Sequence, residues 1–75
     1  MSRRLELYEY EHYHKRYEDT KHNLYIPELH HDIQKWIDEN IAGDYDLEND
    51  DVYYDVISII FDDDVDAMAF KLRWL

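Results

Sequence analysis

Carboxylates are the most numerous chemically active side chains in this sequence, and most of them fall in one segment. The segment between Lys35 and Lys71 holds twelve Asp and Glu and no Lys or Arg. These acids are Asp38, Glu39, Asp44, Asp46, Glu48, Asp50, Asp51, Asp55, Asp62, Asp63, Asp64 and Asp66. The segment alone exceeds the formal net charge of −11, and the rest of the chain is close to neutral. A charge distribution this uneven bears on partners, solubility and association rate rather than on the fold.

Clustered carboxylates raise the question of a calcium site, because hard oxygen ligands suit that ion. No acidic run follows the spaced D-x-[DN]-x-[DN]-G pattern of a calcium loop. The run from Asp62 to Asp64 also lacks the glycine that the sharp turn of such a loop requires. We therefore expect no calcium site.

Four of the five histidines could approach a divalent cation if the fold brought two short segments together. The candidate ligands are His12, His14, His30 and His31, with Glu28 or Asp32. The sequence contains no HExxH motif, and these histidines lie in a polar, tyrosine-rich setting. Surface or hydrogen-bonded histidines are the default interpretation, so we expect no metal.

Side chains for nucleophilic catalysis are scarce. The chain has no Cys, which also removes a disulfide framework and a thiolate metal site. Ser2 is terminal, Ser58 lies in the most hydrophobic segment, and Thr20 has no identifiable base. The single glycine, Gly43, excludes a glycine-rich phosphate loop. A general acid needs a pocket that raises its pKa, so we expect neither an enzyme nor a cofactor in a domain of this size.

Basic residues alternate with tyrosines near the N-terminus, a pattern that can bind single-stranded nucleic acid. The residues are Arg3, Arg4, Lys15, Arg16 and Lys21 with Tyr8, Tyr10, Tyr13 and Tyr17. The acidic segment opposes the approach of phosphate unless the two regions point apart, so we expect no direct binding of nucleic acid. Those basic residues can instead pair with acids of a second copy.

The first 26 residues allow more than one secondary structure. Residues 5–13 are rich in aromatic side chains with rough alternation, which favours a strand. The aromatic and histidine residues between Tyr10 and Tyr17 also recur at helical spacing. Strand, hairpin and helix therefore all remain open for residues 8–25. Residues 18–20 favour a turn, and residues 23–26 favour an extended chain before a proline.

The sequence after residue 26 begins with an amphipathic helix. Its apolar residues from Leu29 to Ile41 fall on a single stripe. Pro27 suits the first helical position, and Gly43 is placed to end the helix. The sequence therefore predicts a helix that begins at Pro27.

The C-terminal half of the sequence contains alternating acidic and apolar residues, two strand-like segments and an acidic turn. Residues 44–48 and 52–61 predict a hairpin, with the second strand central in a sheet. The acids in residues 62–66 predict the first turn of a short helix. Residues 70–74 alternate as a closing strand, although the helix could run on to Leu72. This order predicts an α+β fold of the ferredoxin-like split β-α-β type, with four antiparallel strands and two helices on one face.

One resemblance concerns the C-terminal run from Phe61 to Trp74, FDDDVDAMAFKLRW. This run resembles the ending of small, uncharacterised early proteins of tailed bacteriophages. The resemblance covers fewer than a fifth of the residues. It implies a viral accessory product that acts on host machinery, and it supplies no functional residues.

The acidic segment is the main candidate for function. Alternate residues of a strand lie about 6.6–6.8 Å apart, so Asp44, Asp46 and Glu48 would form a row of carboxylates. This row is about half as dense as the phosphates of one DNA strand, which are about 3.4 Å apart. The other acids of the segment would have to be added for the surface to resemble a phosphate lattice. Aromatic contact area would come from Tyr45, Tyr53 and Tyr54. We therefore expect these fifteen side chains to bind a basic, nucleic-acid-binding host protein.

Size and composition favour a single folded domain over residues 1–75. A hydrophobic content of 45% and eight tyrosines exceed what a disordered acidic tail carries. The longest apolar run, residues 56–61, is far below the ~20 residues that span a bilayer, so we expect a cytoplasmic protein. The favoured function is an inhibitor or regulator that mimics the charge of nucleic acid. The alternative is an assembly protein that associates, as a homodimer or with another virion protein, through its tyrosine-rich N-terminal strand.

Overall fold

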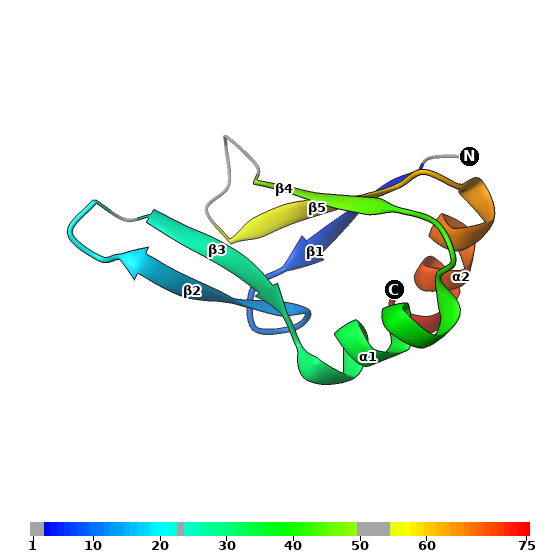
Figure 1. Ribbon diagram of the computed structural model, residues 1–75, viewed down its shortest axis with the longest axis horizontal. Helices are drawn as coiled ribbons and strands as arrows, with labels where there is room; N and C mark the ends of the chain where they lie inside the picture. The colour runs from blue at the N-terminus through cyan, green and yellow to red at the C-terminus, as the bar shows by residue number, and fades with distance from the viewer. Residues whose placement is uncertain (1–2, 23, 50–54) are drawn as a thin grey trace.

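The computed structural model describes residues 3–22, 24–49 and 55–75, and it has an α+β architecture (Figure 1). Its elements are β1 (Arg4–Tyr8), β2 (Tyr13–Asp19), β3 (Leu24–Leu29), α1 (His31–Asn40), β4 (Tyr45–Asn49), β5 (Val56–Phe61) and α2 (Asp64–Trp74). Both sheets are antiparallel, one of three strands and one of two. The molecule is elongated, with extents of 40 × 24 × 20 Å.

The three-stranded sheet has the order β1-β5-β4, so the most hydrophobic strand is central. Leu5 lies opposite Ile59, and Leu47 lies opposite the same residue from the other side. Ile57 and Ile59 are fully buried, as expected for β-branched residues at the centre of a sheet. The predicted hairpin of two strands at residues 44–61 is thus confirmed for the described residues of β4 and β5.

The strands β2 and β3 form a separate hairpin that extends away from the helices (Figure 1). Tyr13 pairs with Leu29 at its base, where both side chains are buried. This hairpin settles the N-terminal ambiguity, and a helix across residues 10–17 is wrong.

The first helix begins later than the sequence predicted. Pro27 lies in β3 opposite Lys15, and α1 begins at His31. Pairing with β2 holds residues 27–29 in an extended conformation, and a hairpin edge tolerates a residue without an N–H. A helical start at Pro27 is therefore wrong, while the apolar stripe of Ile33 and Ile37 is buried as expected.

The second helix replaces the closing strand expected at residues 70–74. Asp63 caps α2 by accepting a hydrogen bond from the backbone N of Val65 at 2.8 Å, and the helix continues to Trp74. Phe70 and Trp74 are one helical turn apart and both contact the ring of Trp36, at centroid distances of 6.0 and 6.4 Å. The described strands therefore do not form the four-stranded ferredoxin-like sheet.

The core lies between the three-stranded sheet and the helices, and the hairpin contributes to it only at its base. Its buried members are Leu7, Tyr13, Leu29, Ile33, Ile37, Ile57, Ile59, Phe61, Ala67 and Phe70. The opposite face of the sheet carries the alternate residues of each strand. Neither helix of the described chain is both long and apolar enough to cross a membrane.

Candidate partner-binding surface

The strand β4 directs two of the predicted carboxylates to the face of the sheet that lies away from the core. Tyr45 and Leu47 are half-buried against the core, so the alternating residues Asp46 and Glu48 lie on the opposite face and are exposed. β4 is an edge strand, and this row of acids is therefore open to solvent. The period of two expected for this segment is confirmed.

The end of the β4-β5 ladder brings further acids beside this row. The backbone N of Asp62 donates to the backbone O of Asp44 at 3.0 Å. Asp66 approaches the same turn, because its Oδ2 accepts a hydrogen bond from the backbone N of Gly43 at 3.2 Å. The acidic first turn of α2 therefore lies next to the start of β4.

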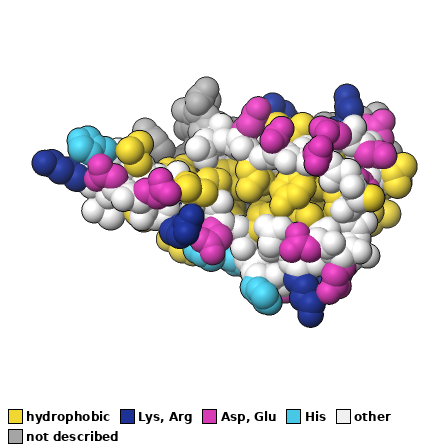
Figure 2. Space-filling model, viewed as in Figure 1, with side chains coloured by type: hydrophobic (Ala, Val, Ile, Leu, Met, Phe, Trp, Pro, Cys, Tyr) yellow, Lys and Arg dark blue, Asp and Glu magenta, His cyan; other side chains and the backbone are white. Residues whose placement is uncertain are grey.

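Seven carboxylates thus follow one another from β4 to the first turn of α2, and we call them the acidic ridge. Its members are Asp44, Asp46, Glu48, Asp62, Asp63, Asp64 and Asp66. Acidic side chains gather along this part of the surface in Figure 2.

Two arginines, Arg4 at the start of β1 and Arg3 directly before it, lie against the ridge. Arg4 Nη2 is 2.8 Å from Glu48 Oε2, and Arg3 Nε is 3.6 Å from Asp64 Oδ1. Arg3 Nη1 also donates to the backbone O of Asp62 at 2.8 Å. The seven carboxylates of the ridge therefore retain five uncompensated charges after these two arginines are counted. The ridge is acidic, but less so than its sequence alone implied.

The acids on the helix α1 are separated from the ridge. Gln34 Nε2 donates to Asp38 Oδ1 at 3.1 Å and to the hydroxyl of Tyr45 at 3.0 Å, which places Asp38 on the core side of β4. Glu39 borders a shallow hollow that it shares with Lys35 and Arg73. The two acids of α1 therefore do not extend the ridge.

Two further predicted residues, Asp55 and Tyr45, are also not on the ridge. Asp55 precedes β5 and lies at the opposite end of that strand from Asp62. Tyr45 is half-buried, with its ring 6.1 Å from that of Phe61, so it is not the flat exposed contact that was expected. The other predicted residues, Asp50, Asp51, Tyr53 and Tyr54, lie outside the described residues.

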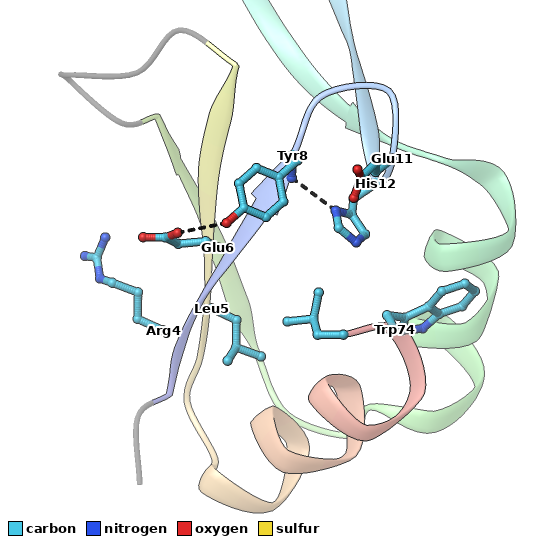
Figure 3. Close-up of a pocket in the computed structure, with 8 residues that line it drawn as sticks. Arg4, Leu5, Glu6, Tyr8, Glu11, His12 and Trp74 are labelled. Carbon is cyan, nitrogen blue, oxygen red and sulfur yellow. Dashed lines mark hydrogen bonds between the residues drawn. The ribbon is translucent and has the colours of Figure 1, made fainter.

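A groove that the sequence did not indicate lies beside β1, with a volume of about 550 Å³ (Figure 3). His12 is 7% exposed, and its Nδ1 accepts a hydrogen bond from the backbone N of Tyr8 at 3.0 Å. The Tyr8 hydroxyl lies 3.3 Å from Glu6 Oε2, and the negative charge of Glu6 raises the pKa of Tyr8. The opposite wall includes Trp74. In the sequence, His12 follows an aromatic, strand-like segment, but its burial beside this groove is visible only in the structure.

A second polar group lies where the hairpin meets β1. Lys15 Nζ is 3.5 Å from Glu9 Oε1, and both side chains are largely buried. Lys15 Nζ also lies 4.8 Å from the ring centroid of Tyr25. The hydroxyl of Tyr13 is buried beside them without a hydrogen-bond partner among the described residues. Burial, together with the charges of Glu9 and Asp55, raises the pKa of Tyr13 to about 12.

The histidines do not assemble as candidate ligands. The rings of His14 and His30 stack at 6.0 Å, whereas His12 is hydrogen-bonded to β1. His14 Nε2 is 3.8 Å from Glu28 Oε1. Across residues 3–22, 24–49 and 55–75, no group of three or more His, Asp or Glu is placed to hold a metal ion.

Comparison with known proteins finds no matching family model, no matching curated protein and no matching solved structure. The geometry of the surface is therefore the basis for any functional assignment.

Proposed function

We propose that this chain is a protein-binding inhibitor or regulator whose acidic ridge occupies the nucleic-acid groove of a basic protein. The single observation that carries the proposal is the continuity of the ridge from Glu48 along β4 to Asp66 in α2. In keeping with the resemblance of its C-terminal run, the chain would be a phage product that acts in the cytoplasm of a host cell on a defence or transcription protein.

The charge of the ridge supports fast, salt-sensitive association. Five uncompensated charges on one surface raise the local concentration of a cationic partner and steer its approach. The row of Asp46 and Glu48 has a spacing of about 6.6–6.8 Å, close to every second phosphate of a DNA strand. Such a row would displace the counterions of Lys and Arg in the groove of the partner.

Anchoring contacts would have to come from apolar side chains next to the ridge, because charges mainly set the association rate. Val65 follows directly on Asp64 in the first turn of α2 and is 72% exposed. It takes the place that Tyr45 was expected to fill.

The test is a capture experiment with the immobilised chain in bacterial lysate at low and at high salt. The captured protein is then purified and its association kinetics are measured against a ridge variant with Asp44→Asn, Asp46→Asn and Glu48→Gln. We expect slower association and a flatter dependence on salt for this variant. We also expect the wild-type chain to displace duplex DNA from the captured protein.

A matched control removes three exposed acids that are not on the ridge, with Glu11→Gln, Glu18→Gln and Glu39→Gln. This control has the same net charge as the ridge variant and should associate almost as fast as the wild type. Equal slowing of both triple variants, or simultaneous binding of DNA and the chain, would overturn the proposal.

The alternative, an assembly protein that associates through its N-terminal strand, has one observation in its favour. Hydrogen bonds from Phe61 N to Arg3 O and from Glu9 N to Asp55 O set the pattern of the β1-β5 ladder. By the alternation of an antiparallel ladder, the backbone N–H and C=O of Glu6 point away from β5 towards the groove. An open strand edge of this kind can pair with another strand.

A further inference from the structure

The outer edge of β4 carries backbone groups that no described strand pairs. β4 pairs with β5 on one side only, and the hydrogen bond from Asp62 N to Asp44 O sets the pattern of this ladder. By the alternation of an antiparallel ladder, the N–H and C=O groups of Asp44 and of every second residue after it point towards β5. Those of Tyr45 and Leu47 therefore point outwards, and no backbone hydrogen bond joins them to another described residue.

The other edge of this sheet, on β1, is partly closed. The same alternation directs the backbone groups of Tyr8 away from β5, and both are already hydrogen-bonded to His12. Tyr8 N donates to His12 Nδ1 at 3.0 Å, and His12 N donates to Tyr8 O at 3.0 Å. The edge of β1 is therefore closed at Tyr8, whereas that of β4 is open along the described strand.

The side chains of β4 give its edge two different faces. Asp46 and Glu48 are exposed on the open face of the sheet, and Tyr45 and Leu47 are half-buried on the core side. Figure 2 shows hydrophobic side chains at the surface below the row of acids, in the region that lies between β4 and α1 in Figure 1. A strand placed beside β4 would therefore meet carboxylates on one face and apolar surface on the other.

The charges of β4 select the kind of strand that fits. Two copies of β4 paired edge to edge would bring Asp46 and Glu48 of one copy beside those of the other, and like charges on neighbouring strands are destabilising. Arg4 pairs with Glu48 from β1, which leaves Asp46 as the principal charge of the edge. A strand with Lys or Arg on this face makes opposite-charge pairs instead. The edge is therefore complementary to a basic strand and not to a second copy.

We propose that β4 binds an extended segment of a basic partner as an added antiparallel strand, in which Lys or Arg alternates with apolar residues. The main chain of the segment pairs with that of Tyr45 and Leu47. Its basic side chains meet Asp46 and Glu48, and its apolar side chains lie on the core side of β4. Main-chain bonds supply affinity in this mode of recognition, and alternate side chains supply specificity. Strand addition in this form rests on the proposed function, because the segment belongs to the basic partner of the acidic ridge.

The first test compares two capped synthetic peptides of equal composition and charge. The probe is Lys-Val-Lys-Val-Lys-Val-Lys, and the control is Lys-Lys-Val-Val-Val-Lys-Lys. We expect NMR titration of the chain to show at least about tenfold tighter binding of the alternating peptide, because only this peptide has one charged and one apolar face as a strand. Equal affinity of the two peptides, or no binding of the alternating peptide at about 1 mM, would overturn strand addition.

Backbone methylation of the alternating peptide separates main-chain pairing from charge. In an antiparallel pair, Val residues lie opposite Tyr45 and Leu47 and exchange hydrogen bonds with them, while the N–H groups of the Lys residues point away. A peptide N-methylated at every Val should therefore bind at least about tenfold more weakly than one N-methylated at every Lys but the first. Both peptides carry the same charge and the same number of methyl groups. If they bind equally well, the antiparallel pairing is wrong.

Amide hydrogen exchange and one substitution locate the peptide on the chain. The backbone N–H groups of Tyr45 and Leu47 should exchange more slowly when the alternating peptide is bound, and unchanged exchange in the saturated complex would refute binding at this edge. Asp46→Asn should weaken binding of the peptide several-fold. The matched control is Glu18→Gln, which removes one exposed charge on the hairpin and should bind as the wild type does.

The failure of strand addition can be told apart from the failure of the proposed function. A chain that displaces DNA from the captured protein but gives equal affinities for the peptides retains the proposed function and loses strand addition. A chain that pairs with the alternating peptide but does not displace DNA retains the strand-binding edge of β4 and loses the proposed function.

Discussion

Arg4 on β1 reaches across the central strand to Glu48 on β4, with 2.8 Å between Nη2 and Oε2. The two residues lie diagonally, since Arg4 is opposite Ile60 and Glu48 is opposite Ser58 on β5. This ion pair connects the two edge strands on the open face of the sheet. It also means that the N-terminal strand, and not only the acidic segment, determines the charge of the ridge.

Replacement of Arg4 by Gln tests this relationship. Both partners are more than half exposed, so the free energy of unfolding should fall by no more than about 1 kcal/mol. The charge of the ridge should become more negative, and the variant should elute from an anion exchanger at higher salt than the wild type. Arg16→Gln is the control, because it removes the same charge from an exposed pair with Glu28 on the hairpin. Equal retention of the two variants would contradict the placement of the ridge as the dominant acidic surface.

Tyr13→Phe tests the buried phenol between the hairpin and β1. The hydroxyl of Tyr13 has no described hydrogen-bond partner, so its removal should leave stability at pH 7 unchanged or raise it by about 1 kcal/mol. At alkaline pH, the buried phenol makes the stability of the wild type fall relative to that of Tyr13→Phe. The pKa of Tyr13 is raised from 10.0 to about 12 in the folded chain, chiefly by burial.

The unfolded chain therefore loses this proton near pH 10 while the folded chain still holds it. The stability that the neutral phenol provides is fully present below pH 10 and is lost as the pH rises towards about 12. Urea denaturation at pH 9, 10 and 11 should show a steeper loss in the wild type than in Tyr13→Phe. Tyr17→Phe, at an exposed tyrosine, should follow the wild type. Parallel pH profiles for all three proteins would count against the buried phenol.

The sequence predicted those elements whose signal lies within one segment. Alternation placed Asp46 and Glu48 on one face of β4, and the apolar run placed Ile57 and Ile59 at the centre of the sheet. It misplaced the start of α1, because the pairing of β3 with β2 overrides the preference of Pro27 for a first helical turn. Long-range pairing of this kind leaves no periodic pattern in the segment itself.

The end of α2 was missed for a different reason. Phe70, Leu72 and Trp74 alternate as in a strand, but Phe70 and Trp74 are also one helical turn apart. The ring of Trp36 selects the helical alternative, and only the fold brings that ring near. The partial neutralisation of the ridge was equally hidden, because Arg4 and Glu48 are 44 residues apart.

The last prediction concerns the pair of Glu9 and Lys15, which joins the turn after β1 to the hairpin at 3.5 Å. Their side chains are only 14% and 12% exposed, so removal of one partner leaves the other charge poorly solvated. Loss of one partner from a fully buried pair costs about 3–5 kcal/mol, and we expect about 2–3 kcal/mol for Lys15→Met because some solvent contact remains. The measurement is the free energy of unfolding from urea denaturation monitored by circular dichroism.

The double variant Glu9→Gln with Lys15→Met removes both charges and should recover most of that loss, since no charge is then left unpaired. Arg16→Met is the control on the same strand, because its pair with Glu28 is exposed and should contribute less than about 1 kcal/mol. If Lys15→Met costs no more than Arg16→Met, the partly buried pair does not anchor the hairpin. In that case the packing of Tyr13 against Leu29 at its base must hold it to the rest of the molecule.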